Sequence, residues 1–149
     1  MLFRSDAIGA KNEDDGFQPI VNCVLGGDVG HLSGELARLR ELALSPVGLL
    51  LAFDRRAAQL AQLAARMGPR GDVGKFMEGE RQARRVFFRD APDLGNQLRR
   101  WRGKRLGRLV ERLVALHREL LANSQSAELL LAQGLTEITR AAAAAERKR

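Results

Sequence analysis

The sequence has little that could support disulfide, zinc or redox chemistry, because Cys23 is its only cysteine. One cysteine can form neither an internal disulfide nor a Cys-based zinc site, and this usage fits a reducing cytoplasm. Tyrosine is absent, and the aromatic residues are six phenylalanines and one tryptophan. The β-branched and aromatic residues that strands favour are scarce beside Leu, Ala, Arg and Glu, which favour helices. We therefore expect an all-α protein.

Patterns for catalysis and for metal binding are also missing. The chain contains no Gly-Lys-Ser or Gly-Lys-Thr, which excludes the common phosphate-binding loop. Neither His31 nor His117 has a second histidine three or four residues away, so a helical metal pair is excluded. His117 falls on an apolar stripe, where a core or interface histidine is favoured over a catalytic base, and Cys23 is interpreted as an inert buried thiol. We expect no enzyme activity, no cofactor and no small-molecule substrate.

Long hydrophobic runs are absent as well. The longest strongly apolar run, residues 46–53, is far shorter than the roughly 20 residues of a membrane-spanning helix. Residues 1–16 lack the apolar core and cleavage site of a secretory signal, and they carry an acidic cluster at residues 13–15. We interpret residues 1–16 as a flexible leader or linker and residues 17–149 as one helical domain. A cytoplasmic location without membrane association is expected.

Apolar residues recur at helical spacing along the rest of the chain. Gly26, Gly27 and Asp28 predict the turn of a helical hairpin, with Asp28 as the N-cap of the second helix, and Ser45-Pro46 predicts the start of a third helix. We expect a single compact bundle of about six or seven helices. The clearest amphipathic helix covers residues 104–122, and its inward stripe is expected to be Leu106, Leu109, Val110, Leu113, His117, Leu120 and Leu121.

Residues 84–101, RRVFFRDAPDLGNQLRRW, allow two interpretations. Pro92 cannot lie inside a helix, so a helix carrying Phe87 and Phe88 is expected to end near Asp90, and a new helix to run from there to about Trp101. The aromatic side chains could be exposed to stack on nucleic-acid bases, or they could pack in the core at this junction. A helical protein with seven aromatic residues needs most of them in its core. We therefore favour a structural hinge formed by Phe87, Phe88, Pro92 and Trp101.

The net charge of +7 is concentrated in residues 81–118, which contain 12 Lys and Arg against 3 Asp and Glu. Such an excess attracts a polyanion or an acidic protein surface, although a merely solvated basic face is equally compatible with it. The candidate residues for contact with DNA or with a protein partner are Arg99, Arg100, Lys104, Arg105, Arg108 and Arg112.

The ordered set of these motifs resembles the C-terminal domain of the delta subunit of bacterial DNA polymerase III, part of the sliding-clamp loader. In that family a Gly-Gly-Asp hairpin leads to a helix opened by Ser-Pro. Next come a valine or isoleucine with two aromatics and a basic residue, a Gln-Leu-x-x-Trp helix and a long Leu/Arg helix. Here these elements fall on residues 26–28, 45–46, 86–89, 97–101 and 104–121, in order, within a match of about residues 17–143.

The resemblance implies a non-catalytic helical domain that joins clamp-loader subunits of the tau/gamma and delta-prime types in a collar during DNA replication. It also implies weak contact between the basic segment and primer–template DNA. The family's two N-terminal domains, including the AAA+-like module that grips the clamp, are not in this chain, so a fragment or truncated gene product is expected. Arg102-Gly103 also departs from the small capping residue that the family often has after the tryptophan.

Two other functions remain open on the sequence alone. The main alternative is an independent helical nucleic-acid-binding protein that uses residues 81–118. A free-standing helical adaptor is the second.

Overall fold

The computed structural model describes residues 16–147, and within this range it confirms the predicted all-α bundle, with seven α-helices and no strand. The prediction of a leader at residues 1–16 therefore falls almost wholly outside the described residues. Helical residues 16–25 are followed by α2 (Val29–Glu41), α3 (Pro46–Met67), α4 (Val73–Gln82), α5 (Ala91–Arg100), α6 (Lys104–Ala122), the short 3-10 helix η1 (Ser124–Ser126) and α7 (Ala127–Arg147).

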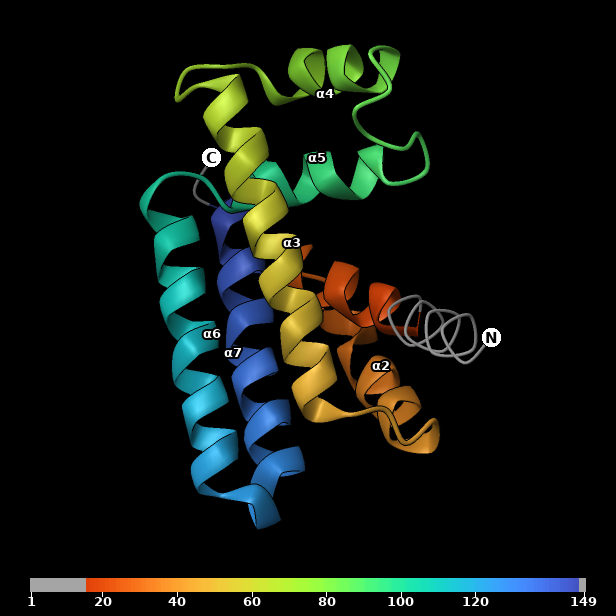
Figure 1. Ribbon diagram of the computed structural model, residues 1–149, viewed down its shortest axis with the longest axis vertical. Helices are drawn as coiled ribbons and strands as arrows, with labels where there is room; N and C mark the ends of the chain where they lie inside the picture. The colour runs from red at the N-terminus through yellow and green to blue at the C-terminus, as the bar shows by residue number, and fades with distance from the viewer. Residues whose placement is uncertain (1–15, 148–149) are drawn as a thin grey trace, which may run out of the picture.

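The body of the bundle consists of the three longest helices, α3, α6 and α7, which run alongside one another (Figure 1). α6 packs against both α3 and α7, and α2 packs against α7. α4 and α5 pair with each other across one end of the bundle (Figure 1). Leucines at helical spacing supply most of the core, because each long helix has one stripe that faces its neighbours. No helix in the described range is both long and apolar enough to cross a membrane.

The turn at residues 26–28 ends the first described helix as the two glycines predict. Gly27 has φ 72°, and the N–H of Asp28 donates to the carbonyl of Cys23 at 2.9 Å. A Cβ atom on Gly27 would lie 2.7 Å from the backbone nitrogen of Ala143, so the turn also presses closely against α7. Glycine is therefore required here for its backbone conformation and for its small size.

The predicted helix starts are correct in position but differ in their capping bonds. The Ser45 hydroxyl accepts from the N–H of Gly48 at 3.1 Å, as an N-cap serine should. Asp28 stands at the N-cap of α2, but its carboxylate binds the His31 ring at 2.8 Å and makes no capping bond. Pro92 lies in the first turn of α5, as predicted, and Asp90 precedes that helix without a side-chain cap.

The predicted helix through Phe87 and Phe88 is wrong, and so is the expected burial of these two side chains. α4 ends at Gln82, and Arg84 adopts the left-handed backbone conformation with φ 58°. The backbone N–H of Arg85 then donates to the carbonyl of Glu80 at 3.0 Å and so terminates the helix. Val86 turns inward, whereas Phe87 and Phe88 are 58% and 57% exposed. Of the four predicted hinge residues, Pro92 lies in the first turn of α5 and Trp101 is buried at its end, whereas the phenylalanines occupy a surface loop.

The inward stripe predicted for α6 is wrong at two positions. Leu106, Leu109, Leu113 and Leu120 are buried, but Val110 is 45% exposed and Leu121 is 74% exposed. α6 has apolar residues on a wider arc than α3 and α7 cover between them. Part of its apolar surface is therefore open to solvent.

Candidate interaction surfaces

The motif Gln-Leu-x-x-Trp, residues 97–101, ties α5 to the first described helix. The Trp101 indole N–H donates to the carbonyl of Leu25 at 2.9 Å, and the Gln97 amide donates to the side-chain oxygen of Asn22 at 2.8 Å. Gln97 and Leu98 are fully buried, and Trp101 is nearly so. These residues hold the fold together and are not available to bind another molecule.

Arg56 of α3 completes this polar network from the opposite side. Its guanidinium donates to Asn22 at 2.6 Å and to Gln97 at 2.8 Å, and it also donates to Gln18. Burial is the main cause that lowers the pKa of Arg56, and the more distant carboxylates of Asp90 and Asp93 oppose that shift. Because all three direct partners are neutral amides, hydrogen bonding is what compensates the buried charge.

Two of the six candidate cations hold the end of α7. Arg100 donates to the carbonyl of Ala142 at 2.8 Å, and Arg105 donates to the carbonyl of Ala141 at 2.7 Å. The Arg105 guanidinium also lies 5.7 Å from the centre of the Trp101 ring. Both side chains are partly buried, and their hydrogen bonds join α5 and α6 to the end of α7. Their role in the structure is therefore to hold these helices together.

The other four candidate cations are exposed, but they do not form one group. Lys104, Arg108 and Arg112 follow one another at intervals of four residues along α6, and Arg112 lies 3.9 Å from Glu137 of α7. Arg99 is on α5, and it lines a groove with Phe88, between α4 and α5. The four exposed cations predicted to contact DNA or a partner therefore lie on two different helices, three on α6 and one on α5.

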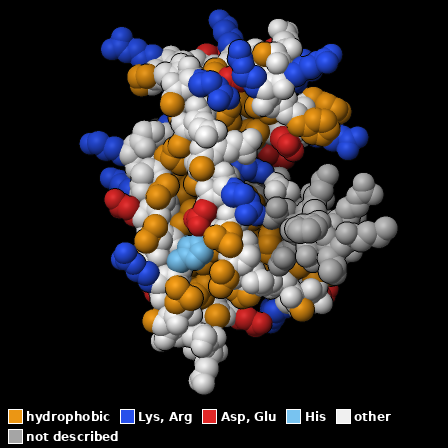
Figure 2. Space-filling model, in the orientation of Figure 1, with side chains coloured by type: hydrophobic (Ala, Val, Ile, Leu, Met, Phe, Trp, Pro, Cys, Tyr) orange, Lys and Arg blue, Asp and Glu red, His pale blue; other side chains and the backbone are white. Residues whose placement is uncertain are grey.

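The exposed aromatic pair is the surface feature that the sequence interpretation missed. The ring centres of Phe87 and Phe88 are 5.0 Å apart, and the Arg89 guanidinium lies 5.9 and 5.7 Å from the two rings. Arg81 and Arg84 line a cleft of about 400 Å³ with both rings. Figure 2 shows Lys and Arg side chains gathered at this end of the molecule. We call Phe87, Phe88, Arg81, Arg84 and Arg89 the aromatic–arginine loop.

A second exposed feature is an apolar strip along α6. Val110, Val114 and Leu121 are exposed and lie four and seven residues apart, so they share one side of the helix. Gly107, three residues before Val110, lies next to the same side. His117 lies among them and is half-buried, and its ring nitrogen is 3.2 Å from the carboxylate of Asp54 on α3. This contact places the strip on the side of α6 that faces α3, and it assigns His117 to an interhelical contact.

α3 continues the same apolar surface. Its exposed residues on the side of Asp54 are Val47, Leu51, Ala58, Ala61 and Ala65, at intervals of three, four and seven residues. Figure 2 shows hydrophobic side chains gathered over α3 and α6 on this face. We call these five residues, together with Gly107, Val110, Val114 and Leu121, the α3–α6 strip.

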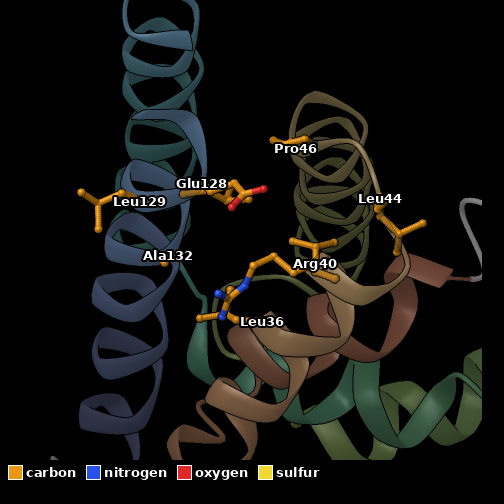
Figure 3. A pocket seen from close by; sticks show the side chains of 10 residues that line it. Leu36, Arg40, Leu44, Pro46, Glu128, Leu129 and Ala132 are labelled. Carbon is orange, nitrogen blue, oxygen red and sulfur yellow. The ribbon is translucent and has the colours of Figure 1, made fainter. Parts of the chain in front are cut away.

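A groove of about 460 Å³ lies between the end of α2, the start of α3 and the start of α7. Leucines from α2 and α7 form much of its lining, and Arg40 and Glu128 point towards the same space from opposite sides (Figure 3). The groove presents one charge of each sign. It therefore does not distinguish an acidic partner from a basic one.

Among the described residues, no group of three or more His, Cys, Asp or Glu side chains is placed to hold a metal ion. Burial raises the pKa of the Cys23 thiol to about 11, aided by the nearby carboxylates of Asp28 and Glu35.

Comparison with protein-family models, with curated proteins and with solved structures found no match to this chain.

Proposed function

We propose that this chain is a collar-type domain of a DNA polymerase III delta subunit, whose function is to hold a sliding-clamp loader together by protein–protein association. One observation carries the proposal: the residues that resemble the family are the residues that shape this fold. Gly27 makes the first turn, Ser45 caps α3, and Trp101 bonds across to Leu25. A motif set that is both ordered in sequence and structural in the fold supports a shared architecture.

The exposed apolar surface supports association as the activity. Exposed large apolar residues grouped on one face, such as Val110, Val114 and Leu121, are typical of a surface that a partner covers. The expected partners are subunits of the tau/gamma and delta-prime types. A role in replication places the chain in the cytoplasm, and the proposed domain itself is non-catalytic.

Co-expression with the other clamp-loader subunits tests this function. We expect the chain to co-purify with tau/gamma and delta-prime subunits, to show no ATP hydrolysis of its own and not to bind the sliding clamp. The control is an unrelated basic helical protein of similar size, since a charge of +7 can cause non-specific binding. A well-folded chain that binds none of these subunits would remove the main support for the proposal.

A second candidate function, nucleic-acid binding by residues 81–118, is favoured by the aromatic–arginine loop. Exposed rings beside arginines are suited to stacking on unpaired bases while the cations contact phosphates. In the proposed collar domain this loop would contact primer–template DNA.

Titration of a fluorescent oligo(dT) at several salt concentrations tests this second function. We expect binding that weakens steeply with salt and weakens further in the Phe87→Ser/Phe88→Ser variant. A Leu42→Ser/Leu129→Ser variant, which changes two exposed apolar residues outside residues 81–118, is the matched control. Equal binding by the aromatic variant and the original chain would show that the loop is not the contact.

A further inference from the structure

Residues 72–90 bury few of their own side chains. They comprise α4, its N-cap residue and the loop that leads to α5, and they lie beyond the three long helices at one end of the molecule (Figure 1). Their buried side chains are Val73, Met77, Glu80 and Val86. A segment with few buried apolar side chains opens at a lower free energy than the core of its protein. We call residues 72–90 the α4 segment.

α4 is weak as a helix in its own right. It has ten residues, fewer than an isolated helix needs in water, and Gly74 and Gly79 lie within it. A Cβ on Gly79 would meet no other side chain or element within 4 Å, so close packing does not require this glycine. Arg84, just after the helix, has φ 58°, which is unfavourable for arginine. α4 therefore depends on its contacts with the rest of the bundle.

An apolar contact and an ionic contact hold α4 on the bundle. The apolar contact is with α5 at Gly95, where an added Cβ would lie 3.5 Å from the Met77 side chain. The groove between α4 and α5, of about 280 Å³, remains beside this contact. The ionic contact is with α3: the buried carboxylate of Glu80 accepts from Arg66 at 3.0 Å, and Arg85 lies 3.4 Å from the same carboxylate.

The chain on either side of the α4 segment is fixed to the bundle. Before it, the carbonyls of Pro69 and Gly71 accept from Arg102 at 3.1 and 3.2 Å. After it, the N–H of Leu94 donates to the carbonyl of Asp90 at 2.9 Å, in the first turn of α5. The residues between these two points can therefore leave the bundle while the points themselves stay in place.

We propose that the α4 segment opens from the bundle as one unit, and that the ion pair between Glu80 and Arg66 is the latch that keeps it closed. The aromatic–arginine loop begins in the last turn of α4, so its cleft exists only when the segment is closed. Opening separates the rings and cations that line this cleft. The opening involves this chain alone and does not depend on the proposed function.

Hydrogen exchange of the whole chain under native conditions, resolved by mass spectrometry, measures the opening. After correction for intrinsic rates, the amides of residues 76–85 should exchange at least about 100-fold faster than those in the middle of α3, α6 and α7. Equal protection of α4 and the long helices would overturn the proposal, because α4 would then open only when the whole chain unfolds.

A core variant far from α4 tests whether the opening is independent. Ile138→Val weakens the packing of α7, so the amides of α6 and α7 should exchange about threefold faster or more. The amides of α4 should exchange at the original rate, because the packing around Ile138 is intact whether α4 is open or closed. Faster exchange of α4 by the same factor would show that it has no opening of its own.

A pair of variants tests the latch. Glu80→Gln removes the charge that binds Arg66 at nearly constant size, and α4 should exchange at least about tenfold faster. Glu78→Gln is the matched control: it loses an exposed pair with Arg81 on the same helix and should change the rate less than about threefold. Equal effects of the two variants would show that Glu80 is not the latch.

A stabilising variant tests the opening without weakening the fold. Gly79→Ala adds a methyl group where there is room and favours the helix, so α4 should exchange about fivefold more slowly. An unchanged rate in α4 would mean that exchange there does not pass through opening of the helix, and it would overturn the proposal even if Glu80→Gln failed to fold. Circular dichroism checks that each variant keeps its helices.

Discussion

The buried guanidinium of Arg56 gives the sharpest prediction about the fold. Gln97→Leu keeps the approximate size of a fully buried side chain but removes the acceptor that lies 2.8 Å from Arg56 and the donor that lies 2.8 Å from Asn22. We expect the variant to be markedly less stable, because a charged donor in the interior loses a partner that no nearby carboxylate can replace.

The magnitude follows from the two lost hydrogen bonds. A bond to a charged group contributes about 1.5–3 kcal/mol and a neutral one about 1 kcal/mol, so the free energy of unfolding should fall by about 2–4 kcal/mol. Arg56→Met removes the charge itself and retains much of the apolar packing. In the double variant Arg56→Met/Gln97→Leu the apolar side chains face each other, so the two losses should fall short of additivity by about 1–2 kcal/mol.

Urea denaturation of the four proteins, followed by circular dichroism, measures these values, with the slope of each transition checked for two-state behaviour. Leu98→Ala, a deletion of ordinary core packing in the same helix, calibrates the scale, with an expected loss of about 2–5 kcal/mol. A loss below about 0.5 kcal/mol in Gln97→Leu, or strict additivity in the double variant, would refute the assigned network.

Three further changes have outcomes that the structure fixes. Gly27→Ala should lower the free energy of unfolding by about 2 kcal/mol or more, as measured by thermal denaturation. The backbone angle φ of 72° is unfavourable for alanine, and the added Cβ would lie 2.7 Å from the backbone nitrogen of Ala143. Phe87→Ser/Phe88→Ser should change stability by less than about 0.5 kcal/mol per site, since both rings are exposed, and a large loss would show that they pack after all. Cys23 of the folded chain should react slowly with a thiol reagent at pH 8 and faster as the pH approaches its raised pKa of about 11. The urea-unfolded chain should react rapidly at pH 8. Fast labelling of the folded chain at pH 8 would contradict the burial of Cys23.

Helix positions could be predicted from the sequence where local signals agree with packing. Ser45-Pro46 marks the start of α3, and the leucines at 106, 109, 113 and 120 identify the buried side of α6. Capping and periodicity are local properties, so the residues that express them are adjacent in the sequence. Val110 and Leu121 lie beside these leucines on the apolar side of α6. They are exposed because α3 and α7, which pack against α6, do not reach them, and the local sequence carries no signal of this.

The candidate surfaces were less predictable because they depend on tertiary contacts. Arg84 ends α4 with a positive φ that usually belongs to glycine, so nothing local signals that Phe87 and Phe88 leave the helix. Arg56 looks like a surface residue of α3 until Asn22 and Gln97, far away in the sequence, surround it. Arg100 and Arg105 look free in the sequence for the same reason.

Competition with an intact delta subunit tests the central claim most directly. Increasing amounts of this chain are added while a clamp loader is assembled from tau/gamma, delta-prime and full-length delta subunits, and clamp loading onto primed DNA is measured. If the proposal holds, residues 1–149 compete with full-length delta for its place in the collar. We then predict a dose-dependent loss of loading, because the displaced delta takes with it the module that grips the clamp. Undiminished loading in the presence of excess folded chain, with intact delta still in the complex, would contradict the account.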